Sequence, residues 1–153
     1  MFTYSKTYVT VFAALALLGA GCSKNSAQMN ESSPVPNVSV NVSININNNA
    51  YSGLKTVGNV VYLTNVGNRG ILVYRFSASG SQQIVAFDRT CPYDLPDNGG
   101  IVFSQYNNTA VCQDCSSTYD LTNGNVVSGP STIGIKQYNV SFNASTGAVT
   151  ITN

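Results

Sequence analysis

The chain has 153 residues, of which only 8% are charged, with seven basic and six acidic side chains. This balance leaves no basic patch to attract nucleic acid, so we expect no nucleic-acid partner. The sequence also contains no histidine, which excludes the Ser-His-Asp and Cys-His arrangements of many hydrolases. The length is that of a single domain, and an enzymatic role is not favoured.

The first 21 residues are predicted to be a secretory signal peptide. Lys6 is the only charge before Lys24, and the residues from Val9 to Ala20 are mostly apolar. A charged start, a short apolar run and small residues before a cleavage site are typical of such signals. The run is shorter than the roughly 20 apolar residues that a membrane span needs.

The end of this segment and the cysteine after it, Gly19-Ala20-Gly21-Cys22, resemble the lipobox of bacterial lipoproteins. The resemblance implies that Cys22 is lipidated and becomes the mature N-terminus, which anchors the protein to a membrane surface without spanning it. We therefore expect a cell-envelope lipoprotein. Ser23 differs from the aspartate that holds some lipoproteins at the inner membrane, so the outer membrane is preferred. Residues 22–37 are polar with two prolines, and they are expected to be the lipidated cysteine and a flexible tether.

From residue 38 to residue 153 the sequence predicts an all-β domain. Apolar and polar residues alternate from Val38 to Ile46, which is the pattern of a half-buried strand, and the interleaved asparagines favour a sheet edge. Turn residues such as Gly67-Asn68 and Asn123-Gly124 separate the later apolar runs, which show no helical periodicity. These runs are residues 60–63, 71–76, 84–87, 101–103, 109–112, 133–142 and 148–152. Short strands at this spacing indicate an antiparallel sandwich or small barrel.

Two short cysteine boxes carry the chemistry of the chain. They read Cys91-Pro92-Tyr93 and Cys112-Gln113-Asp114-Cys115. Five aspartates lie between residues 88 and 120, where Arg89 is the only basic residue. Aspartate is common in turns, so these residues either form turns or favour a site for cations.

From Ile71 to Thr152 the order of features resembles a Rieske domain. A hairpin leads into the first box, and a glycine-rich turn and a strand lead into the second. Ser117-Thr118-Tyr119-Asp120, then Gly129-Pro130, then a closing hairpin follow. The resemblance implies a Rieske-like fold of antiparallel sheets or a small barrel with a cysteine-box subdomain. It also implies that Ser117 and Tyr119 hydrogen-bond to cluster sulfurs and that Gly129-Pro130 covers the cluster.

Compared with that family, the ligand set is incomplete. Cys91 and Cys112 stand at the two cysteine-ligand positions, whereas Tyr93 and Cys115 stand where the family has histidines. A Rieske [2Fe–2S] centre needs two histidines on one iron, and this chain has none. The cofactor is therefore expected to be a 2Fe–2S cluster with non-standard ligands, or to be absent.

Four interpretations remain open. The preferred one is a binding or structural module without a cluster, in which two of Cys91, Cys112 and Cys115 pair as a disulfide in an oxidising compartment. The alternative is an electron carrier with a 2Fe–2S cluster on these cysteines and an oxygen of Asp94 or Tyr93. The third is a single metal such as Zn²⁺ on the three cysteines and Asp94. The fourth is thiol–disulfide exchange at Cys112 and Cys115, which the absence of a βαβ pattern disfavours.

Overall fold

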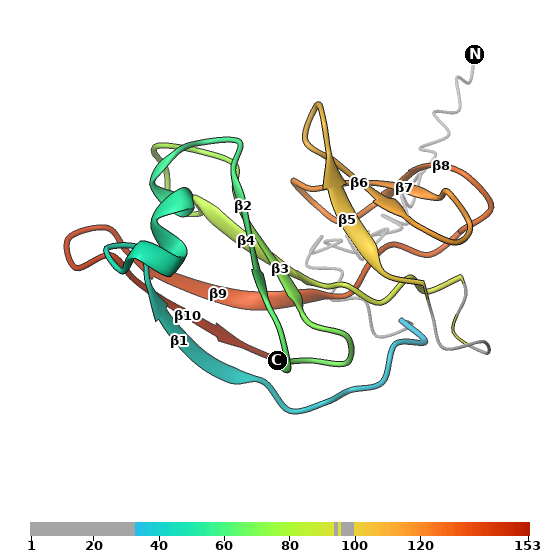
Figure 1. Ribbon diagram of the computed structural model, residues 1–153, viewed down its shortest axis with the longest axis horizontal. Helices are drawn as coiled ribbons and strands as arrows, with labels where there is room; N and C mark the ends of the chain where they lie inside the picture. Colours follow the sequence, from blue (N-terminus) through green and yellow to red (C-terminus); the bar gives the residue numbers. More distant parts are fainter. Residues whose placement is uncertain (1–32, 94, 96–99) are drawn as a thin grey trace, which may run out of the picture.

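The computed structural model describes residues 33–93, 95 and 100–153, and within them it contains ten β-strands and one 3-10 helix (Figure 1). The strands are β1 (Asn41–Asn45), β2 (Val60–Leu63), β3 (Ile71–Arg75), β4 (Ile84–Asp88), β5 (Val102–Gln105), β6 (Thr109–Cys112), β7 (Thr118–Asp120), β8 (Val126–Ser128), β9 (Gln137–Asn143) and β10 (Ala148–Thr152), and the helix is η1 (Asn49–Lys55). The strands pair antiparallel in two sheets, which confirms the predicted all-β fold with a separate cysteine-bearing part.

The larger sheet has six strands in the order β1-β10-β9-β4-β3-β2. One half consists of β1, β10 and β9, and the other consists of β4, β3 and β2. They join where β4 pairs with β9, through Ala86 opposite Tyr138 and Phe87 opposite Gln137. The sheet curls at this join, so that β1, β10 and β9 face β2, β3 and β4 (Figure 1). The apolar faces of the two halves are therefore turned toward each other.

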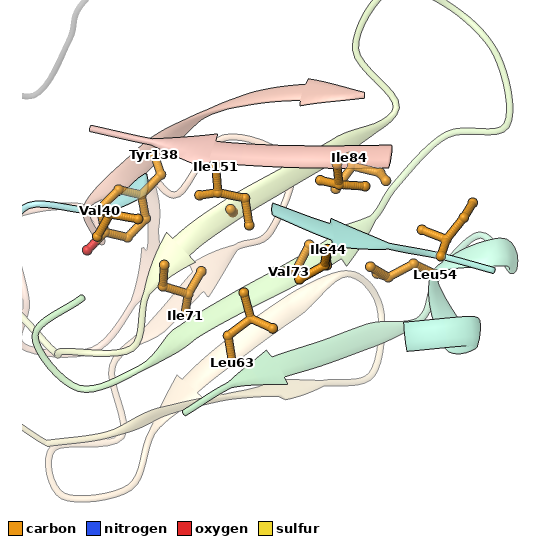
Figure 2. Packing of buried hydrophobic residues seen from close by; sticks show 12 residues of the cluster. Val40, Ile44, Leu54, Leu63, Ile71, Val73, Ile84, Tyr138 and Ile151 are labelled. Carbon is orange, nitrogen blue, oxygen red and sulfur yellow. The ribbon is translucent and has the colours of Figure 1, made fainter. Parts of the chain in front are cut away.

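Side chains from both halves meet in the first hydrophobic core (Figure 2). Ile71, Val73 and Ile151 are completely buried there, and Leu54 of η1 closes one end. The buried members are Val40, Ile44, Ile46, Leu54, Leu63, Ile71, Val73, Ile84, Ala86, Tyr138, Val149 and Ile151. Each large aliphatic side chain buried in this way contributes roughly 1.5–3 kcal/mol to folding.

Strands β3 and β4 are buried on both faces. Ile71 and Val73 of β3 belong to the first core, whereas Leu72 and Tyr74 belong to a second core that contains the cysteines. Successive side chains of a strand point to opposite faces, so a strand between two cores needs a continuous apolar run. This requirement explains why the sequences of β3 and β4 do not alternate.

The smaller sheet has four strands in the order β5-β6-β7-β8. Residues 106–108 form the turn between β5 and β6. Asn107 and Asn108 have φ values of 60° and 59°, in the left-handed region that asparagine adopts more readily than most residues. Val102 lies opposite Cys112, and Ala110 lies opposite Tyr119. The inner face of this sheet and the outer face of β3 and β4 enclose the second core. Its buried members are Leu72, Tyr74, Val85, Phe87, Cys91, Val102, Ala110, Cys112, Tyr119, Leu121 and Ile135.

Three local features differ from the sequence prediction. The predicted strand at residues 133–142 begins only at Gln137, because residues 133–136 cross between the sheets, with the Ile135 N–H donating to Gly124 O. Strands β7 and β8 were not expected, since three residues are too few to show a period. Helix η1 was also not expected, because Leu54 is its only buried residue and one apolar side chain makes no stripe.

The end of the expected tether contacts the domain. Val35 is 4% exposed, and Lys136 Nζ donates to Asn37 Oδ1 at 2.9 Å and to Pro36 O at 3.3 Å. The predicted signal peptide and Cys22 lie outside the described residues. Within the ranges that the structure describes, no helix is long and apolar enough to cross a membrane.

Candidate metal centre

Three cysteines from separate segments bring their sulfurs together. Cys91 follows β4, Cys112 ends β6, and Cys115 lies in the turn before β7. The three sulfur atoms lie within 4.8 Å of one another, and those of Cys91 and Cys115 are 3.6 Å apart. All three residues are thiols in this structure. Cys91 and Cys112 are completely buried, whereas Cys115 is partly exposed.

The segment Gly100–Ile101 brings the two cysteine boxes together. The Cys91 N–H donates to Gly100 O at 2.7 Å, and the Gln113 N–H donates to Ile101 O at 3.2 Å. One short piece of backbone thus binds both boxes. The turn could be predicted from its glycines, but the direction of its carbonyl groups toward both boxes could not.

The second box closes on itself as a tight loop. The Cys112 N–H donates to Ser117 O at 2.9 Å, and the Ser116 N–H donates to Cys112 O at 3.1 Å. Ser116 adopts a left-handed conformation with φ of 60°, which a residue with a side chain takes up at some cost. This turn reverses the chain and returns Cys115 toward Cys112.

A buried carboxylate fixes the chain just before Cys91. Asp88 is 1% exposed, and its Oδ1 accepts hydrogen bonds from the Thr90 N–H at 2.9 Å and the Thr90 hydroxyl at 2.6 Å. Its Oδ2 accepts from the Asn68 N–H at 2.8 Å and from the Tyr138 hydroxyl at 2.6 Å. Burial, followed by this bond to Asp88, raises the pKa of Tyr138 above its ordinary value, so Tyr138 remains a donor. The four bonds hold Thr90, and hence Cys91, in place.

Arg89 ties the larger sheet to the smaller one beside Cys91. Its guanidinium carbon lies 4.6 Å from the centre of the Tyr62 ring and 4.5 Å from that of Phe103, and its Nε donates to Val102 O at 3.3 Å. The Tyr62 oxygen also accepts from the Ser104 N–H at 3.0 Å. Burial lowers the pKa of Arg89 from its ordinary value. Contacts of a guanidinium with aromatic faces contribute about 0.5–2 kcal/mol, and here they join β2 to β5.

Two hydroxyl groups reach the sulfurs. The Tyr119 hydroxyl lies 3.2 Å from Cys91 Sγ, and the Cys115 thiol donates to Ser117 Oγ at 3.1 Å. Burial, followed by the bond to Cys91, raises the pKa of Tyr119 well above its ordinary value, so this hydroxyl keeps its proton and donates. Burial raises the pKa of the Cys91 thiol, and hydrogen bonds from Tyr119, Cys112 and the Tyr93 backbone oppose that shift.

The loop at Gly129 packs directly on Ser117. A Cβ added to Gly129 would lie 2.5 Å from Ser117 Cα, and the residue has φ of +98°, so only glycine fits. Ser131 completes the contact, because its backbone N–H donates to Ser117 Oγ at 3.0 Å. Ser131 was not predicted from the sequence, where its position directly after Gly129-Pro130 was the one available signal.

Of the two oxygen ligands expected from the sequence, Tyr93 and Asp94, the structure describes only Tyr93. The Tyr93 side chain is 52% exposed, although its backbone contacts Cys91. Asp94 lies outside the described residues. Asp120 accepts hydrogen bonds from the backbone and hydroxyl of Thr122, both at 2.7 Å, which is the turn role. Among the residues described, the group that can hold a metal consists of Cys91, Cys112 and Cys115, with no carboxylate or histidine.

These residues do not fit a Rieske centre, because that cluster needs two histidines and the chain has none. They do fit one metal ion. Thiolates bound to one tetrahedral ion at about 2.3 Å lie roughly 3.8 Å from each other, close to the 3.6 Å between Cys91 Sγ and Cys115 Sγ. A disulfide would instead require the sulfurs to approach to about 2.05 Å.

Comparison with known proteins finds no matching family model and no curated protein of similar sequence. Weak structural likenesses exist. The ferredoxin of carbazole 1,9a-dioxygenase from Nocardioides aromaticivorans IC177 is 14% identical, with 74% of this chain and 96% of that chain covered and a TM-score of 0.48. A putative NADH-dependent nitrite reductase small subunit from Mycobacterium tuberculosis is 13% identical, with 76% and 96% covered and a TM-score of 0.45. The terminal oxygenase of carbazole 1,9a-dioxygenase from the same Nocardioides strain is 24% identical, with 63% and 26% covered and a TM-score of 0.41. Because all three scores are low, the function is inferred from the residues of this chain.

Proposed function

We propose that this chain is a lipid-anchored protein of the bacterial cell envelope whose Rieske-like domain binds a single metal ion through Cys91, Cys112 and Cys115. The observation that carries the metal site is the convergence of three sulfurs to within 4.8 Å. Soft thiolate ligands select ions such as Zn²⁺ and Cu⁺. The membrane location is supported by the signal-like start and by the lipobox resemblance at Cys22.

A single ion is preferred to a [2Fe–2S] cluster because of how the sulfurs are arranged. The ligands of a two-iron cluster are divided between two metals, which separates the two pairs. Here the sulfur of Cys115, which stands where the resemblance implies a Rieske histidine, lies 3.6 Å from the sulfur of Cys91. Such a distance suits two ligands of the same ion.

The second candidate is a structural module closed by a disulfide, and the same short distance between Cys91 and Cys115 favours it. In an oxidising compartment neighbouring thiols tend to pair. One of the three thiols would then remain. The two candidates therefore differ in metal content and in thiol count.

The test uses the full-length chain purified in detergent under reducing conditions. Titration with Co²⁺ followed by displacement with Zn²⁺ should show one ion per chain, with intense thiolate-to-metal absorption bands. Cys115→Ser should weaken binding by at least about 100-fold, because one of three linked ligands is lost. Cys22→Ser is the matched control, since Cys22 lies outside the three-cysteine group.

Three outcomes would contradict the metal proposal. Two irons with inorganic sulfide per chain would support the electron carrier instead. A protein that, when purified without reductant, contains no metal and has a single reactive thiol would support the disulfide module. Equal loss of binding in the Cys22→Ser control would place the site elsewhere.

The membrane proposal is tested by fractionation. The wild type should sediment with membranes and Cys22→Ser should not, and a soluble wild type would overturn the proposal.

A further inference from the structure

We infer that the ion best suited to this site is trivalent and three-coordinate, of the class represented by arsenite and antimonite. The inference rests on the proposed metal site and concerns which ion it prefers. Its basis is the number of ligands, the burial of the sulfurs and the charge that three thiolates bring.

The number of ligands favours three-coordination. Cys91, Cys112 and Cys115 supply three sulfurs, and the described residues add no carboxylate or histidine to the group. Structural Zn²⁺ sites are almost always four-coordinate, so zinc would require a further ligand. A trivalent arsenic or antimony ion carries a lone pair in place of a fourth ligand. It can therefore sit above a triangle of three sulfurs with its bonding complete.

The surroundings favour a neutral product. The side chains of Cys91 and Cys112 are 0% and 1% exposed, and their core neighbours are apolar, among them Val102 and Leu121. The hydrogen-bond partners of Cys91 and Cys115 are neutral groups, among them the hydroxyls of Tyr119 and Ser117. Burying an uncompensated charge is costly. Three thiolates leave a net charge of −2 with Cu⁺ and −1 with Zn²⁺, but zero with a trivalent ion.

The binding step balances without an oxidant, a reductant or an added base. Arsenite, As(OH)₃, reacts with three thiols to form three S–As bonds while three As–O bonds break. Each departing hydroxide takes the proton of one thiol and leaves as water, and arsenic stays trivalent. The three cysteines are thiols in this structure, which is the form that the reaction uses. Cys115 is the partly exposed member and offers the first point of contact.

The experiment titrates the reduced full-length chain in detergent with sodium arsenite. Thiols that remain reactive are counted with a chromogenic thiol reagent, and the intact mass is measured. We expect one arsenic per chain, a mass gain of one arsenic atom less three hydrogens, and protection of all three thiols. Arsenite should also displace Zn²⁺ from the preloaded protein. Cys22→Ser should behave like the wild type, whereas Cys115→Ser should bind arsenite at least about 100-fold more weakly.

The outcomes separate this inference from the proposed function. Protection of only two thiols would overturn the three-coordinate site. Binding of one Zn²⁺ or Cu⁺ that arsenite does not displace would overturn the preference for a trivalent ion and leave the metal centre intact. Failure of every ion to bind would overturn both. The displacement measurement uses the wild type alone, so its result does not depend on whether a variant folds.

Discussion

Replacing Tyr119 with phenylalanine isolates the hydrogen bond to the Cys91 sulfur. The hydroxyl is completely buried and lies 3.2 Å from Cys91 Sγ. When a metal holds Cys91 as a thiolate, this bond joins a neutral donor to a charged acceptor, which contributes about 1.5–3 kcal/mol. Losing the bond should therefore weaken metal binding about 10- to 100-fold, as is usual for groups that support a metal ligand.

Tyr74→Phe is the matched control for this prediction. Tyr74 is 2% exposed and belongs to the same core as Tyr119, but its hydroxyl donates to the Asn108 side chain and not to a sulfur. Both variants should lose a similar stability of about 0.5–1.5 kcal/mol without metal, measured by urea unfolding. Zn²⁺ affinity, measured by competition with a chelating dye, should fall only in Tyr119→Phe. If both variants lose affinity alike, or if Tyr119→Phe keeps the wild-type affinity, the hydroxyl does not act on a bound thiolate.

Three further predictions concern the frame around the site. Tyr138→Phe should lower the free energy of unfolding by about 1–3 kcal/mol, because Asp88 loses one of its four donors while it stays buried; an unchanged urea midpoint would argue against this. Gly129→Ala should lower the free energy of unfolding by more than the strain of a left-handed residue, which is about 1–2 kcal/mol, because its Cβ would clash with Ser117. The same clash should weaken Zn²⁺ binding. Gly80→Ala, with a similar φ of +96° and nothing within 4 Å, should show the strain alone, and equal losses in the two variants would refute the clash. Removal of metal with a chelator should lower the melting temperature of the wild type, by the linkage between binding and folding, and an unchanged transition in a calorimeter would contradict it.

The strands were predictable where a single physical signal dominates. Alternation marks the half-buried β1, and continuous apolar runs mark β3 and β4, which separate two cores. Strands β7 and β8 escaped prediction because each has three residues and is defined by its partners in the sheet. Helix η1 escaped because the Asn48 side chain begins it by accepting from the Ala50 N–H, and its burial shows no period.

The cysteine site was predictable in its composition and not in its geometry. The two cysteine boxes in the sequence identified Cys91, Cys112 and Cys115 as candidate ligands, but the spacing of residues along the chain does not set the distances between their sulfurs. Those depend on Gly100–Ile101 binding both boxes and on the turn at Ser116. These contacts are made by the backbone, so they cannot be predicted from the pattern of side chains along the sequence.

For the five aspartates between residues 88 and 120, the sequence left two interpretations open, turns or a site that favours cations. Asp88 accepts four internal hydrogen bonds and Asp120 holds a turn. These two carboxylates add to the negative charge of the segment, but their hydrogen bonds lie within the fold. Hydrogen bonding within the fold therefore accounts for both residues without a role as ligands.

Strands β3 and β4 contribute side chains to both cores, so they connect the proposed metal site to the rest of the domain. A residue such as Leu72 touches the cysteine-bearing core, while its neighbour Val73 touches the other core. A ligand bound at the sulfurs should therefore slow hydrogen exchange on the far side of this shared wall as well as beside the cysteines. Occupancy of a site made by three side chains should therefore change the rigidity of the larger sheet as well as that of the cysteine-bearing core.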